Sequence, residues 1–112
     1  MKLMDLVKKL SLEIKTYKEE LQRDVTDGYV SDLLSDVIAN SEKDNIWITL
    51  QTHPNIVAVA TLKELAGIII VGKRQPQEET LQKAEAEKIT IMTTPLPAFE
   101  VAGKIYQLIK ST

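Results

Sequence analysis

Residues that could contact a charged ligand gather in four short polar segments of the chain. Each segment follows a stretch that predicts a β-strand and leads into one that predicts a helix. The candidate ligand-binding residues are Ser31, Asp32, Gln51, Thr52, His53, Asn55, Gly72, Lys73, Arg74, Thr93 and Thr94. Free N–H groups at helix N-termini bind anions, and Lys73 and Arg74 would add positive charge. We therefore expect a site for a small anionic or nucleotide-like ligand, with helix capping and turn formation as the alternative roles of these residues.

His53 is the one imidazole of the chain, and an imidazole can act as a general base. Ser31 and Asp32 would complete a hydrolytic trio with it. However, no G-x-S-x-G elbow surrounds Ser31. The phosphate-binding motifs G-x-x-x-x-G-K-[ST] and G-x-G-x-x-G do not occur either. The residues thus predict no catalytic site, and a loop or capping role for His53 is preferred.

The composition excludes several other classes of site and partner. Without cysteine and with one histidine, the chain cannot build a thiolate or His-based zinc site. Asp32 and Asp36 could share a helix face and hold a cation, but a solvated face is the preferred interpretation. A net charge of −2 argues against nucleic-acid binding. Residues 1–10 are too short and too charged for a signal peptide or membrane span, so we expect a cytoplasmic protein without a cofactor, a metal or a membrane contact.

The hydrophobic pattern predicts the elements that must position the polar segments. Helices are predicted over residues 2–10, 32–40, 55–65 and 76–88 and from residue 97 onward. Strands are predicted over residues 12–16, 25–29, 46–50, 68–71 and 89–92. Ser31 is expected to cap a helix, Pro54 and Pro76 to open one, and Gly67 to stop one.

This order of elements predicts an α/β fold. From residue 25 on, strands alternate with helices, which is typical of right-handed crossovers in a mostly parallel sheet. We expect one three-layer α/β/α domain over residues 1–112. In open sheets of this kind, ligands bind beyond the carboxyl ends of the strands, where all four polar segments would lie.

Four blocks in order along the chain resemble the DRTGG-domain family. Tyr29–Val37 is similar to that family's helix start, G-Y-x-S-D-x-L-S. Ile46–Gln51, His53–Ala60 and Phe99–Ala102 are similar to its later blocks. The resemblance covers roughly residues 12–110.

The naming motif of the family is degraded in this chain. Its place is taken by Gln22–Gly28, which keeps only an arginine and the last glycine. The resemblance implies an α/β domain similar to the N-terminal domain of HPr kinase/phosphorylases. Similar domains accompany CBS domains in regulated pyrophosphatases and occur in phosphate acetyltransferases. There the domain is regulatory or forms dimers, without agreed catalytic residues.

Together, the residues and the resemblance predict a non-catalytic regulatory or oligomerisation domain. We expect a homodimer whose interface includes the Tyr29–Ile38 region and Trp47. A separate signalling or metabolic protein is the expected partner, and the polar edge would sense the nucleotide or anion. Two alternatives stay open: a small enzyme acting on a phosphorylated metabolite at the same edge, and a scaffold without a ligand.

Overall fold

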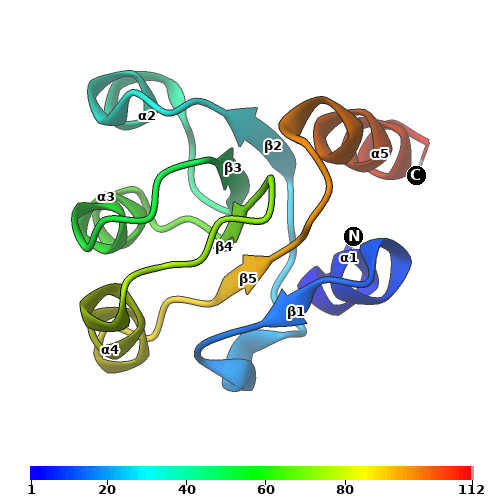
Figure 1. Ribbon diagram of the computed structural model, residues 1–112. Helices are drawn as coiled ribbons and strands as arrows, with labels where there is room; N and C mark the ends of the chain where they lie inside the picture. The colour runs from blue at the N-terminus through cyan, green and yellow to red at the C-terminus, as the bar shows by residue number, and fades with distance from the viewer. Residues whose placement is uncertain (112) are drawn as a thin grey trace.

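The central sheet has the strand order β1-β5-β4-β3-β2 in the computed structural model, which describes residues 1–111 (Figure 1). The strands are β1 (Glu13–Ile14), β2 (Asp27–Val30), β3 (Asn45–Thr49), β4 (Gly67–Ile70) and β5 (Ile91–Thr93). Strands β2 to β5 are parallel neighbours in sequence order, and β1 pairs antiparallel with β5. The predicted α/β class with a mostly parallel sheet is confirmed.

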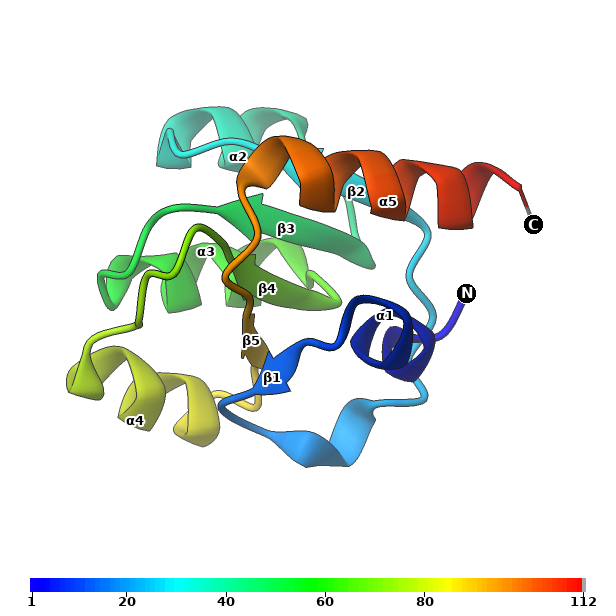
Figure 2. The same ribbon diagram turned by 45° about the vertical axis from the view of Figure 1, so that its right-hand side comes forward.

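Helices cover both faces of this sheet (Figures 1 and 2). They are α1 (Leu3–Leu10), α2 (Leu34–Asn40), α3 (Asn55–Lys63), α4 (Glu78–Ala86) and α5 (Ala98–Lys110), with a short 3₁₀ helix η1 (Lys18–Glu20). Crossovers of one hand place α2, α3 and α4 on one face, while α1 and α5 cover the other. In the described part of the chain, no helix has the length and apolar character needed to cross a membrane.

Alternate residues of the strands feed two apolar cores. Ile46 and Ile48 of β3 point to the core under α1 and α5. Trp47, between them, points to the core under α2, α3 and α4 and is 0% exposed. Its indole Nε1 donates a hydrogen bond to the carbonyl oxygen of Ser31 at 2.8 Å. The expectation that Trp47 lies at a subunit interface is therefore wrong, because the sheet and helices of its own chain enclose it.

Three predicted helix boundaries differ from the structure. The residue before α2 is Leu33, so Ser31 is not its cap; the Ser31 hydroxyl accepts the Leu33 N–H instead. Helix α4 begins at Glu78, two residues after Pro76, because Gln77 keeps an extended backbone and donates its N–H to the Thr52 carbonyl.

The predicted helix stop at Gly67 is also wrong. Helix α3 ends at Lys63, and Glu64 takes the left-handed conformation with φ 52°. Gly67 instead begins β4 and is buried. Glycine is needed at this position because the neighbouring strands pack closely around it, and not because a helix ends there.

Candidate functional site

The four polar segments lie side by side along the carboxyl edge of the sheet. Because β2, β3, β4 and β5 are parallel neighbours, the loops that follow them line up in the same order. The structure thus brings the candidate ligand-binding residues to one edge. Thr93 and Thr94 differ from the other candidates in exposure. Thr93 is the last residue of β5, Thr94 follows it, and each is only 4% exposed.

Asp32 ties the loop after β2 to the end of β3. Its Oδ1 accepts hydrogen bonds from the Thr49 hydroxyl at 2.8 Å and from the Leu50 N–H at 2.7 Å. The Gln51 side chain donates to the Asp32 carbonyl at 2.9 Å. These bonds hold Asp32 before the first turn of α2, so it does not share a helix face with Asp36 as a cation pair would require.

The loop after β3 is held from both sides. The Thr52 carbonyl accepts the Thr80 hydroxyl at 2.7 Å and the Gln77 N–H at 3.3 Å, which joins this loop to the start of α4. The His53 Nδ1 accepts the Asn55 N–H at 3.1 Å, so the imidazole caps the start of α3. The capping role preferred for His53 agrees with this contact.

The loop after β4 carries exposed positive charge. Gly72 and Lys73 both take left-handed backbone, with φ 73° and 66°. Backbone bonds from Gly72 to Leu96 and from Lys73 to Thr94 fasten the turn to the loop after β5. The side chains of Lys73 and Arg74 are exposed, and neither forms an ion pair among residues 1–111.

The described contacts do not assemble a hydrolytic trio. Ser31, Asp32 and His53 each form hydrogen bonds, but to Leu33, β3 and Asn55 rather than to one another. A nucleophile and its base need a direct hydrogen bond or a water bridge between them. The geometry of this edge therefore favours loop positioning over proton transfer.

A polar cluster under the edge anchors α2 to β2. The Asp36 Oδ1 accepts the Tyr29 hydroxyl and the Asn40 side-chain amide, each at 2.8 Å. Hydrogen bonds from Ser31, Asn40 and Tyr29 hold the pKa of Asp36 below its ordinary value. The same bond to Asp36 raises the pKa of Tyr29.

Replacing Asp36 by asparagine is expected to flatten the loss of stability in acid. A carboxyl group whose pKa is lowered in the folded state stabilises the protein above its unfolded pKa, about 3.9, and loses that contribution as pH falls through the folded value. The unfolding midpoint of the parent should therefore fall more steeply below about pH 4 than that of Asp36→Asn. Thermal unfolding between pH 7 and pH 2 measures this, with Glu87→Gln at an exposed position as the control. Parallel curves for the parent and Asp36→Asn would contradict it.

Arg23 was not among the predicted site residues, yet it organises the opposite edge of the sheet. Its Nε donates to Asp44 Oδ1 at 3.0 Å, and its Nη2 donates to the Glu64 carbonyl at 2.7 Å. The Glu64 carbonyl, at the end of α3, also accepts the Asp44 N–H at 3.0 Å, so Arg23 adds a second hydrogen bond at this helix end. Its place in the degraded naming motif was the available signal, and the structure gives it a positioning role.

Comparison with known proteins gives one family and one fold. The DRTGG domain family model matches residues 5–108. A search of curated proteins finds no match. Among solved structures, the chain resembles the CBS and DRTGG domains of the regulatory region of the Clostridium perfringens pyrophosphatase, complexed with the activator diadenosine tetraphosphate. The match has 21% identity and a TM-score of 0.72.

The structural match covers 95% of this chain and 46% of the solved chain. At this identity the likeness establishes the shared fold, and the chain spans about half the length of the protein it matches. The family model, in contrast, extends over nearly all the described residues. The resemblance in the sequence blocks is thereby confirmed, and the chain belongs to the DRTGG domain family.

Proposed function

We propose that this domain is a non-catalytic regulatory module that self-associates and senses a small anionic or nucleotide-like ligand at the carboxyl edge of its sheet. The observation that supports ligand binding is the exposed pair Lys73 and Arg74, which lacks ion-pair partners among residues 1–111. Their loop lies between β4 and α4, next to the loop that leads into α3. Positive side chains beside helix N-termini favour phosphate groups.

The similar pyrophosphatase region supports the regulatory part of this proposal. That region binds a dinucleotide activator, and its two kinds of domain are described as regulatory. A regulatory domain needs a fold that holds its loops in place, and the bonds of Asp32 and Thr52 supply this here. In our proposal a separate signalling or metabolic protein in the cytoplasm responds to the domain.

The bonding within the loops favours one second candidate, which is a scaffold without a ligand. Asp32, Gln51 and His53 already bond to neighbouring loops or helix starts, so these groups are partly used within the chain. The two candidates differ in one measurable property. A ligand-sensing domain binds a phosphorylated probe through Lys73 and Arg74, and a scaffold does not.

We expect adenosine triphosphate or diadenosine tetraphosphate to bind the parent, and the double variant Lys73→Asn/Arg74→Ala to bind at least tenfold more weakly. A charge-assisted hydrogen bond contributes about 1.5–3 kcal/mol, and 1.4 kcal/mol corresponds to a tenfold change in Kd. Asparagine is chosen at position 73 because it tolerates the left-handed backbone found there. Isothermal titration calorimetry measures both constants.

The matched control is Lys8→Asn/Lys9→Ala on α1, which removes two exposed positive charges from the opposite face of the sheet. It should bind like the parent. If the parent binds neither nucleotide at millimolar concentration, ligand sensing is excluded and the scaffold stands. Equal weakening in both double variants would show attraction by overall charge rather than a site.

A further inference from the structure

Strand β2 leaves one side of its backbone open at the edge of the sheet. The Ser31 N–H donates to the Ile48 carbonyl of β3 at 3.3 Å, so the backbone groups of Val30, one residue earlier, face away from β3. Strand β2 is the last strand of the sheet, and within residues 1–111 no strand pairs with that side. Edge strands usually carry a charge or a proline that prevents further pairing, and Gly28–Val30 has neither. Val30 thus offers a free backbone position to an added strand.

The first half of β2 is closed by its own chain. The Asp27 Oδ1 accepts the Gly28 N–H at 2.9 Å, and the Asp27 Oδ2 forms an ion pair with Lys110 of α5 at 3.3 Å. These contacts occupy the outward donor at Gly28 and neutralise the one charge on the strand. The open part of the edge is therefore short and centred on Val30, which is 52% exposed.

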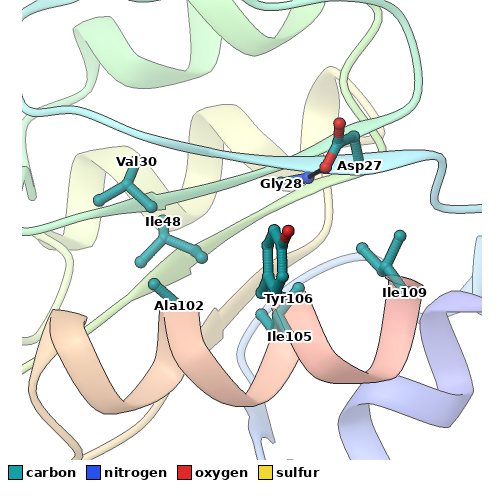
Figure 3. A pocket seen from close by; sticks show the side chains of 8 residues that line it. All are labelled: Asp27, Gly28, Val30, Ile48, Ala102, Ile105, Tyr106 and Ile109. Atoms are coloured by element: carbon teal, nitrogen blue, oxygen red, sulfur yellow. Dashed lines mark hydrogen bonds between the residues drawn. The ribbon is translucent and has the colours of Figure 1, made fainter. Parts of the chain in front are cut away.

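An apolar groove lies beside this open backbone, between β2 and α5 (Figure 3). Its volume is about 130 Å³, and its lining includes Val30, Ile48, Ala102, Ile105 and Tyr106. Opposite residues of paired strands face the same side of the sheet, so a residue opposite Val30 would point to this groove. A cavity of about 150 Å³ holds a benzene molecule. The groove therefore suits one aliphatic side chain of an added strand.

The neighbouring residues of an added strand would face a negatively charged surface on the other side of the sheet. Tyr29 lies on the α2 side of β2, and its hydroxyl donates to the Asp36 Oδ1 at 2.8 Å. Asp36 forms no ion pair among residues 1–111. The hydrogen bonds that lower the pKa of Asp36 keep its carboxylate charged. An arginine here would pair with this carboxylate and stack on the Tyr29 ring.

This charge favours a basic partner over a second copy of the chain. If two copies paired through β2 in one continuous sheet, the Tyr29 and Asp36 side of one copy would lie beside that of the other. Like charges across a strand pair are destabilising. Recognition by strand addition takes its affinity from main-chain hydrogen bonds and its specificity from pockets for alternate side chains. The β2 edge supplies the first, and the groove and Asp36 supply the second.

We propose that an extended segment of a partner protein adds antiparallel to β2 at Val30, with an aliphatic side chain in the groove and an arginine on each side of it against Tyr29 and Asp36. The antiparallel direction is the more stable pairing per residue. This inference rests on the separate partner protein in the proposed function and assigns the surface that it contacts. The loop with Lys73 follows β4, two strands away from β2, so the two sites can be tested separately.

The probe is the acetylated and amidated peptide Thr-Arg-Leu-Arg-Thr, titrated into the isotope-labelled full chain and followed through the amide resonances by nuclear magnetic resonance. We expect the largest shift changes at Val30 and along the groove. Ala102→Leu fills the groove and should weaken binding at least tenfold. Ala58→Leu, at an exposed position of α3, is the matched control and should bind like the parent. Asp36→Asn should remove the preference for Thr-Arg-Leu-Arg-Thr over Thr-Ser-Leu-Ser-Thr.

Altered probes test the same contacts on the unchanged protein. Methylating the backbone nitrogen of the probe's leucine removes the donor to the Val30 carbonyl and should weaken binding at least tenfold. Methylating an arginine nitrogen, which points away from β2, should have little effect. Equal binding of the leucine-methylated probe, or of Thr-Glu-Leu-Glu-Thr, overturns the proposal.

The remaining outcomes separate this inference from the proposed function. No shift change at Val30 with millimolar probe, while a nucleotide binds at Lys73 and Arg74, overturns the added strand and leaves ligand sensing standing. Probe binding without nucleotide binding supports the added strand and excludes ligand sensing. Val30 shifts that depend on protein concentration without probe would identify a second copy as the occupant and overturn the basic partner.

Discussion

Replacing Trp47 by alanine is expected to lower the free energy of unfolding by about 3–5 kcal/mol. Trp47 is the largest fully buried side chain, and it packs in the core with Val37, Ile56 and Val57. Alanine would leave a cavity that the parallel strands on each side cannot close. Because domains of this size are stable by about 5–15 kcal/mol, the variant should unfold at a much lower urea concentration.

Two further variants separate the causes of this loss. Trp47→Phe keeps most of the buried volume but leaves the Ser31 carbonyl without its indole donor, which should cost about 1–3 kcal/mol. Phe99→Ala removes an aromatic side chain that is 91% exposed and should change stability by less than about 0.5 kcal/mol. Urea unfolding at low micromolar protein measures all three. Similar losses in Trp47→Ala and Phe99→Ala would contradict this assignment of core and surface.

The sequence pattern predicted the parallel architecture because the signals for each strand and helix lie within that element. Asn55–Lys63 has apolar residues on nearly every side and could be a strand by composition. The need for a crossover between two parallel strands, together with Pro54, correctly favoured a helix. The same logic placed the polar loops at one edge, since parallel neighbours end at the same edge.

Contacts between distant segments were not available to the same reasoning. A serine followed by an aspartate indicates a helix cap, and only the pairing of β2 with β3 brings Asp32 to Thr49 and Leu50. Arg23 likewise contacts the end of α3 across 41 residues of sequence, and only the fold brings the two together. Local propensity gave way here to charge-assisted bonds across the fold.

The exposed aromatic residues of α5 left a signal in the sequence that was not used. Val101 and Ile105 form the buried side of this helix. Phe99 and Tyr106 fall outside that side, which makes them aromatic residues on the polar side of an amphipathic helix. In a chain with only 4% aromatic residues, such a placement can be recognised from the sequence alone.

Replacing Gly67 by alanine is also expected to destabilise the protein. Gly67→Ala should lower the free energy of unfolding by about 1–3 kcal/mol. A Cβ at this position would lie 3.0 Å from Met92 Cε, 3.1 Å from the Thr90 carbonyl oxygen and 3.3 Å from Ile46 Cδ1. Met92 can shift its terminal methyl group. The Thr90 oxygen cannot shift easily, because it accepts the Ile68 N–H in the ladder between β4 and β5.

Gly103→Ala is the matched control, because it adds the same methyl group to open space on a helix. Alanine favours helix by about 1 kcal/mol relative to glycine, so this variant should be as stable as the parent or more so. If Gly67 only stopped a helix, alanine there would be tolerated about as well as at position 103. If the free energy of unfolding falls in Gly67→Ala and rises in Gly103→Ala, close strand packing is the reason for glycine at position 67. Equal stabilisation of both variants would refute it.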